Sequence, residues 1–356
     1  MAMNADFNTV IAASEKERRD LFVGAATRLG TAVQNVEKDF WVAWVLDALF
    51  NGLQPGGPRL LFKGGTSLSK AFGLISRFSE DIDITVFRQD LGQPVEVEEL
   101  EGLSGKKRRA RLDEIRAACQ QYIAGPLSDQ LQAIASAVIT EGNFKLELDP
   151  DDKDGQCLLF WYPAAAVQPK PGDYIRSAVK IEAGAKSALD PHTSASVTPY
   201  VAEDLANLNL QVENIITVRP ERTFWDKVMI LHGLRQWHAK RGELRHAGQR
   251  VSRHYYDVYR LMRADPGNAW RADQALAADC ARHARMFFGS PDLGLETAAA
   301  GGFTLVPDEA MRAPLAKDYE AMAGMIFGEV PALADVLAAV AELEAALNAA
   351  TAGSPA

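Results

Sequence analysis

The sequence predicts an α+β fold in which a mixed sheet, flanked by helices, is followed by a helical C-terminal domain. Apolar residues recur at helical spacing in residues 33–49. Between residues 60 and 182, several short segments alternate apolar and polar residues with a period of two, which is typical of strands. From about residue 220 onward the periodicity is mainly helical. The order of these patterns places the sheet between two helical parts of the chain.

The first part of the chain is expected to alternate between helix, strand and tight turn. Residues 7–55 are predicted to be helical. Residues 60–62 form a short buried strand, residues 67–74 a helix, and residues 81–87 a second strand. This order allows the turn after the first strand to meet the beginning of the second.

Further helices and strands follow in the middle of the chain. Residues 100–140 are predicted to be helical, with a break at Gly125-Pro126, because proline disrupts a helix interior. Residues 144–148, 157–162 and 174–182 are expected to add strands to the same sheet.

The length of 356 residues allows two or three domains. We expect an N-terminal helical segment over residues 1–55 and a sheet core over residues 56–218, with a helical insertion at about 100–140. A helical C-terminal domain is expected over residues 219–350. No internal repeat is visible.

Composition indicates a cytoplasmic protein that is not bound to a membrane. Apolar residues make up 47% of the chain and charged residues 24%, which is ordinary for a globular protein. No apolar run approaches the roughly 18 residues that a membrane span needs, and the first residues lack the features of a signal peptide. The three cysteines lie far apart without metal-ligand spacing, as in a reduced protein.

One segment combines a glycine turn with two carboxylates. Lys63-Gly64-Gly65-Thr66-Ser67 reads as a tight turn with hydroxyls at the start of a helix, and Asp81 and Asp83 lie on one face of the following strand. Two aligned carboxylates suit Mg²⁺, which completes its shell with water and substrate phosphates. Backbone N–H groups of a glycine turn can hold those phosphates. The segment therefore predicts metal-dependent nucleotidyl transfer. An edge strand with two exposed acids is the alternative, because it would show the same sequence pattern.

A third carboxylate could complete a metal site. Glu182 lies in an alternating segment that places it on the same face as Lys180. Glu147 is the rival for this role, and a surface-facing glutamate is the structural alternative for each. The sequence leaves the choice between Glu182 and Glu147 open.

Two later helices carry candidate charged residues. Lys227 follows a possible N-cap at Thr223 and could hold a triphosphate, or it could be a solvated surface lysine. Asp257 lies among aromatic residues on an apolar helix, where a carboxylate must be paired. It could form a structural pair with Lys227 or Arg253, or it could act in the active site by orienting Lys227 or the incoming hydroxyl.

The net charge of −9 argues mildly against a general nucleic-acid coat protein, but two basic clusters stand out, at residues 106–111 and 235–253. Such clusters can be solvated faces or can contact an RNA backbone, because phosphate contacts come largely from Lys and Arg.

Six motifs occur in a fixed order over most of residues 30–345: Val36-Glu37-Lys38-Asp39-Phe40-Trp41, Phe62-Lys63-Gly64-Gly65-Thr66-Ser67-Leu68, Arg77-Phe78-Ser79-Glu80-Asp81-Ile82-Asp83, Val179-Lys180-Ile181-Glu182, Thr223-Phe224-Trp225-Asp226-Lys227 and Arg253-His254-Tyr255-Tyr256-Asp257. Together they resemble the nucleotidyltransferase AbiEii/AbiGii toxin family of the DNA polymerase β-like superfamily. The chain departs from the common pattern at His254, where an aspartate is frequent.

The resemblance implies a polymerase β-like nucleotidyltransferase core and a site for Mg²⁺ and a nucleoside triphosphate. The residues carried over are Gly64, Gly65, Thr66 and Ser79 for phosphates, Asp81 and Asp83 for Mg²⁺, and Lys227 and Asp257 for activity. It also implies a toxin of a toxin–antitoxin or phage-defence system, with tRNA as acceptor and a cognate antitoxin as partner. Two alternatives stay open: transfer to a small molecule or protein, and a non-catalytic nucleotide-binding scaffold.

Overall fold

The computed structural model of the chain describes residues 2–140, 143–166, 177–248 and 251–349. Residues 174–176 of the strand expected over 174–182 lie outside these ranges. By its contacts the chain forms two compact units. The first, here called the sheet unit, comprises Met1–Phe72, Phe78–Val95 and Gly105–Val218, and the second, the helical unit, comprises Gly73–Arg77, Glu96–Ser104 and Arg219–Ala356. The predicted division into three domains stays a prediction.

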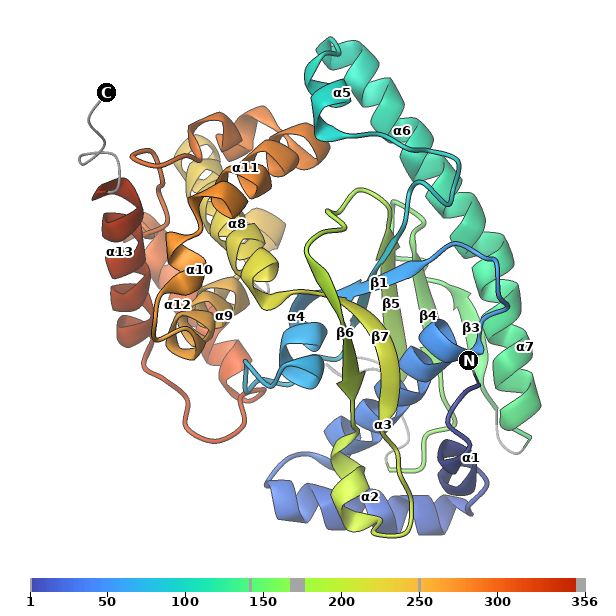
Figure 1. Ribbon diagram of the computed structural model, residues 1–356. Helices are drawn as coiled ribbons and strands as arrows, with labels where there is room; N and C mark the ends of the chain where they lie inside the picture. The colour runs from blue at the N-terminus through green and yellow to red at the C-terminus, as the bar shows by residue number, and fades with distance from the viewer. Residues whose placement is uncertain (1, 141–142, 167–176, 249–250, 350–356) are drawn as a thin grey trace. The chain divides into compact units, whose positions relative to one another are not determined.

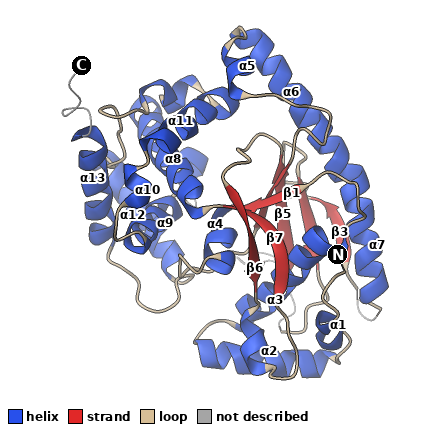
Figure 2. Ribbon diagram, viewed as in Figure 1, coloured by secondary structure: helices blue, strands red, loops and turns tan. Residues whose placement is uncertain are grey.

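Within the described residues, the sheet unit contains a seven-stranded mixed sheet with the order β3-β4-β5-β2-β1-β7-β6 (Figures 1 and 2). Strand β1 pairs in parallel with β7 and β2 with β5, whereas the other neighbours are antiparallel. The strands are β1 (Leu60–Lys63), β2 (Ile82–Val86), β3 (Lys145–Leu148), β4 (Cys157–Trp161), β5 (Ala178–Gly184), β6 (His192–Val197) and β7 (Val212–Val218).

Helices flank this sheet, which confirms the predicted α+β class. Helix α3 (Val33–Asp47) packs against β5 and β7, and its Trp41 stacks on Tyr162 at 5.5 Å between ring centroids. Burial of such large aromatic rings dominates core energetics, so α3 is fixed firmly on the sheet. The remaining helical segments of this unit are α1 (Asp6–Ile11), α2 (Glu15–Leu29), η1 (Ala48–Gly52), α4 (Gly64–Thr66), η2 (Ser67–Ala71), α6 (Gly105–Tyr122), η3 (Ile123–Leu127), α7 (Ser128–Val138) and η4 (Tyr200–Asp204).

The expected break at Gly125-Pro126 is wrong. Pro126 lies inside η3, a π-helical turn that joins α6 to α7 without interruption. Proline clashes with the preceding turn of an α-helix, and the wider π-helical turn relieves that clash.

Strands β6 and β7 were not predicted. The sequence of β6, His192–Val197, is polar and mostly exposed at the sheet edge, so it lacks the alternation on which strand prediction depends.

The helical unit is built around α8 (Pro220–Arg241) and α9 (Ser252–Ala264), which pack on each other. Pro220 stands at the first position of α8, where its missing N–H has no partner in any case. Tyr255 and Tyr256 of α9 are fully buried. The other elements are α5 (Val97–Glu101), η5 (Arg245–Gly248), α10 (Ala269–Ala272), α11 (Gln274–Phe288), η6 (Pro291–Leu293), η7 (Leu295–Thr297), α12 (Glu309–Ala323) and α13 (Leu333–Ala349).

In the part of the chain that the structure describes, no helix combines the length and the apolar character that a membrane span requires.

Candidate functional site

The glycine turn follows directly from strand β1 and touches the acidic strand β2. Gly64 begins α4 with a φ of +80°, a backbone conformation that residues with a Cβ rarely adopt. A Cβ added at Gly64 would lie 2.0 Å from Oδ2 of Asp83. Only glycine fits there, and its absence of a side chain is what allows the turn and the carboxylate to meet, as the sequence predicts.

Both predicted metal-binding carboxylates belong to the segment that enters β2. Asp81, the first residue of the expected strand over 81–87, lies immediately before β2, and Asp83 lies within it. Asp83 is in register with Lys63 of β1 on one side and with Glu182 of β5 on the other. Lys63 Nζ lies 4.0 Å from Oδ1 of Asp83. The sheet therefore brings Lys63, Asp83 and Glu182 into one row across three strands.

Negative charge accumulates at this row. Burial, as the largest cause, and the neighbouring carboxylates of Glu182, Glu80 and Asp83 together raise the pKa of Asp81 to about 6, with Lys38 acting in the opposite direction. Like charges that face each other in a poorly solvated place disfavour ionisation. A bound cation would relieve this repulsion.

Glu182 and Glu147 occupy different parts of the sheet. Glu182 neighbours Asp83 through the β2–β5 pairing, and its Oε1 lies 2.9 Å from Nζ of Lys180. Glu147 belongs to the edge strand β3, where it accepts a hydrogen bond of 2.9 Å from Nε1 of Trp161. The strand order separates Glu147 from β2 by two strands, so Glu182 is the carboxylate that stands beside the aspartates.

The predicted phosphate-binding hydroxyls hold the turn itself. Thr66 and Ser67 are fully buried. The hydroxyl of Thr66 donates to the carbonyl of Asp81 and shares a 2.9 Å hydrogen bond with the hydroxyl of Ser79. The hydroxyl of Ser67 donates to the carbonyl of Gly64 at 2.9 Å. Thr66 and Ser67 thus fix the turn against the acidic segment, and Lys63, Gly64, Gly65 and Ser79 are the members of the predicted set that are partly exposed.

The residues of the second candidate group meet inside the helical unit. Nζ of Lys227 on α8 lies 2.9 Å from Oδ2 of Asp257 on α9. The guanidinium of Arg77 binds the same carboxylate with two hydrogen bonds of 2.8 Å. Lys227 and Arg77 are buried and Asp257 is fully buried. The structural pair between Asp257 and Lys227, one of the two alternatives, is therefore present.

The charges of this group stabilise one another. Burial alone would raise the pKa of Asp257, but Arg77 and Lys227 outweigh it and hold this pKa well below its usual range. Burial lowers the pKa of Lys227, and Asp257 opposes that shift. Burial also lowers the pKa of His254, with Lys227 and Arg253 adding to the effect, so His254 is neutral here.

Sequence reasoning missed Arg77 and three charged residues of α3. Arg77 stood in a recognised motif, but its partner Asp257 is remote in the sequence. Glu37, Lys38 and Asp39 are all buried, and Lys38 Nζ lies 2.6 Å from Oε2 of Glu80. Consecutive charged residues inside an apolar helix were the available signal, because such residues are rarely buried unless they are paired.

Among the described residues, no group of three or more His, Cys, Asp or Glu side chains is arranged to hold a metal ion. The donors at the glycine turn nevertheless fit Mg²⁺, because it is bound through one or two carboxylates together with substrate phosphates rather than by an all-protein cage. Asp81 and Asp83 supply those carboxylates, and the raised pKa of Asp81 reflects charge that a cation would offset.

The chain matches one family of known proteins over most of its length. A family profile described as "Nucleotidyl transferase AbiEii toxin, Type IV TA system" matches residues 47–349. Among solved structures, MenT4, a nucleotidyltransferase toxin from Mycobacterium tuberculosis H37Rv, matches with 17% sequence identity over 92% of this chain and 97% of that chain, at a TM-score of 0.35. A search of curated proteins found no match. Because the profile spans most of the chain, this protein belongs to the AbiEii nucleotidyltransferase toxin family of type IV toxin–antitoxin systems.

Proposed function

We propose that this protein is a Mg²⁺-dependent nucleotidyltransferase, of the 2.7.7 class, that transfers a nucleoside monophosphate from a nucleoside triphosphate to an RNA acceptor such as the 3′ end of tRNA. The observation that carries the proposal is the contact between Gly64 and Asp83, which joins a backbone turn suited to phosphate with carboxylates suited to a cation. The setting would be the cytoplasm, and the toxin family implies a cognate antitoxin as partner.

In this proposal, different residues of the sheet unit bind the metal ion and the phosphates. Asp81 and Asp83 would bind the metal, with Glu182 as a further carboxylate beside them. A bound divalent cation supplies Lewis acidity, which activates the acceptor hydroxyl and stabilises the leaving pyrophosphate. The backbone N–H groups of Gly64 and Gly65 and the ammonium of Lys63 would orient the phosphates and offset the charge that grows in the transition state.

The family's motifs, rather than a measured distance, bring Lys227 and Asp257 into this proposal. We propose that Lys227 binds a substrate phosphate and that Asp257 orients it. An ammonium has three donors, so the bond to Asp257 leaves Lys227 capacity for a phosphate oxygen.

The basic clusters support RNA as the acceptor class to different degrees. Lys106, Lys107 and Arg109 are exposed in the first turns of α6, whereas Arg111 forms an ion pair with Glu114. In the second cluster, Arg235 and Arg241 form ion pairs with Asp308 and Asp292, so less of their charge is available to a ligand. Residues 249–250 of that cluster lie outside the described ranges. Helix α6 is thus the stronger candidate for contact with an RNA backbone.

The decisive experiment uses purified protein, Mg²⁺, each α-labelled nucleoside triphosphate in turn, and total tRNA. We expect label to enter tRNA with the wild-type protein and not with Asp81→Asn or Asp83→Asn. Glu147→Gln, on the same sheet but away from the aspartates, is the matched control and should label normally. Equal labelling by the wild type and Asp81→Asn would contradict the assignment of the site. Labelling of a protein or a small molecule in place of tRNA would support the alternative acceptors, and binding of Mg²⁺ and nucleotide without transfer to any acceptor would favour the nucleotide-binding scaffold.

A further inference from the structure

Helix α3 carries three successive charged residues that each bind a different segment of the sheet unit. Glu37 accepts hydrogen bonds from the backbone N–H groups of Ala165 and Ala166, at 2.6 and 3.1 Å. Lys38 forms an ion pair with Glu80, and Asp39 forms one with Lys70, both at 2.6 Å. The proposed function uses none of these α3 residues.

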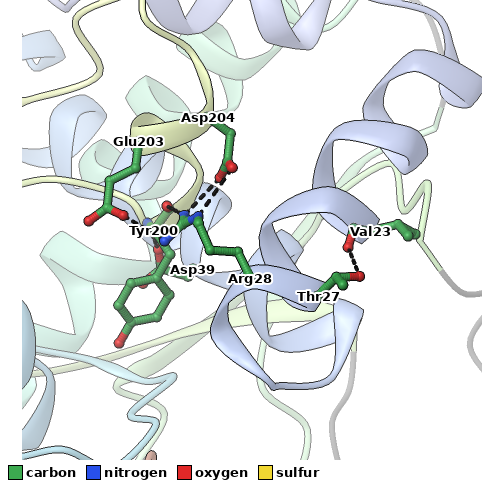
Figure 3. A network of polar contacts seen from close by, with 7 residues as sticks. All are labelled: Val23, Thr27, Arg28, Asp39, Tyr200, Glu203 and Asp204. Carbon is green, nitrogen blue, oxygen red and sulfur yellow. Dashed lines mark hydrogen bonds and ion pairs between the residues drawn. The ribbon is translucent and has the colours of Figure 1, made fainter.

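The network around Asp39 reaches further. Its Oδ2 accepts a 2.6 Å hydrogen bond from the backbone N–H of Tyr200, whose carbonyl in turn accepts from Arg28 of α2 (Figure 3). Nζ of Lys70 lies 3.6 Å from the centroid of the Tyr200 ring. Asp39 is therefore held from several sides, and it holds Lys70 at the end of η2, the π-helical turn that continues from the glycine turn.

These contacts fix both halves of the candidate site to one rigid helix. Glu80, the partner of Lys38, is the residue before Asp81, and Lys70 lies in the last turn of the helical segment that Gly64 begins. Gly64 and Asp83 meet where the two segments face each other. Helix α3 itself is fixed by aromatic packing, as between Trp41 and Tyr162.

Stability alone does not explain why these positions are charged. The side chains of Lys38 and Glu80 are 4% and 7% exposed, so both have lost most of their hydration. Replacing a buried ion pair by apolar residues of similar volume is often neutral or stabilising. Methionine or leucine would fill the same space beside the apolar residues of α3. The two charges therefore point to a role in fixing one geometry, which apolar packing does not supply.

We propose that Lys38 is a positioning residue, which holds the Asp81 carboxylate in the geometry that binds a divalent cation by anchoring Glu80 to α3. Asp39, through Lys70, holds the glycine turn in the same way. This inference rests on the proposed function, and it adds that α3 sets the spacing between the phosphate-binding turn and the metal-binding acids.

The test replaces the pair with apolar residues of similar size, in Lys38→Met/Glu80→Met. We expect its melting temperature to stay within a few degrees of the wild type, whereas the affinity for Mn²⁺, measured by titration without nucleotide, falls about tenfold or more. Loss of a partner that orients metal ligands typically costs 10–100-fold in metal affinity. The matched control is Arg59→Met/Asp90→Met, which removes another ion pair of the sheet unit and should leave Mn²⁺ affinity unchanged.

A second pair of variants keeps the test decisive if the apolar pair fails to fold. Glu80→Asp retains the charge but withdraws the carboxylate from Lys38 by one methylene, so it should weaken Mn²⁺ binding several-fold. Adding Lys38→Arg, whose side chain is longer, should restore it. Wild-type Mn²⁺ affinity in Lys38→Met/Glu80→Met or in Glu80→Asp would show that the pair serves the fold alone. If Asp81→Asn itself leaves Mn²⁺ binding unchanged, the metal site of the proposed function fails instead, so the two failures are distinguishable.

Discussion

Lys227 and Asp257 form a buried ion pair, with 2.9 Å between Nζ and Oδ2, and Asp257 binds the guanidinium of Arg77 at the same time. Both carboxylate oxygens of Asp257 are engaged, and its side chain has no exposed surface. A carboxylate in this state is suited to fixing the position of a cation and not to binding a metal ion. The two alternatives for Asp257 therefore converge, because the structural pair is also what would orient Lys227.

Loss of this carboxylate should destabilise the protein strongly. In Asp257→Asn, Lys227 and Arg77 stay buried without a counter-charge, which typically costs about 3–5 kcal/mol. We expect urea denaturation to show a decrease of that order in the free energy of unfolding. Asp335→Asn, an exposed acid of α13, should change it by less than about 0.5 kcal/mol. Wild-type stability in Asp257→Asn would mean that the two cations find other partners.

The ionised carboxylate of Asp81 should destabilise the folded protein above pH 6. Its folded pKa of about 6 lies above its usual value, so the folded state holds the proton more tightly than the unfolded state. The resulting stability is present at low pH and is lost as the pH rises through 6. Asp81→Asn, which resembles the protonated form, should therefore melt higher than the wild type at pH 8 and similarly at pH 4.

The same experiment with Mg²⁺ gives an independent check. Mg²⁺ should raise the melting temperature of the wild type at pH 8, because a bound ligand stabilises the state that binds it, and should have little effect on Asp81→Asn. A melting-temperature difference that does not vary with pH would argue against a strained Asp81.

Gly64→Ala should be far more harmful than the same change at Gly92. Both glycines have a positive φ, +80° and +69°, which costs an alanine roughly 1–2 kcal/mol. A Cβ at Gly92 meets nothing within 4 Å, whereas at Gly64 it would meet the Asp83 carboxylate. We expect Gly92→Ala to keep its transferase activity and Gly64→Ala to lose it, in the tRNA-labelling assay. Equal activities would show that Asp83 moves aside without consequence.

Glu182→Gln should lower transferase activity, with Glu147→Gln as its matched control. Glu182 pairs in register with Asp83, whereas Glu147 lies on the edge strand. Removing the charge of Glu182 should weaken Mg²⁺ binding, seen as a higher Mg²⁺ concentration for half-maximal rate. If Glu147→Gln has the larger effect, Glu182 is not the third carboxylate of the metal site, although the strand order places it beside Asp83.

Sequence patterns predicted much of this protein because they report local geometry. The period of two placed Asp81 and Asp83 on one face, and the Gly-Gly turn after a buried strand predicted the backbone that Gly64 adopts. Helical periodicity located α3 and α8. The break at Pro126 failed because a π-helical turn, which periodicity does not reveal, accommodates the ring.

The partners of charged residues were decided by tertiary structure alone. The sequence contained both Glu147 and Glu182, but only the strand order, with β5 beside β2, separates them. Lys38 and Glu80, or Arg77 and Asp257, are far apart along the chain, and a local pattern cannot show which charges meet. The sequence by itself therefore determined the residue types of the candidate site and their local faces. Long-range pairing, driven by the need to compensate buried charge, decided which of them lie together.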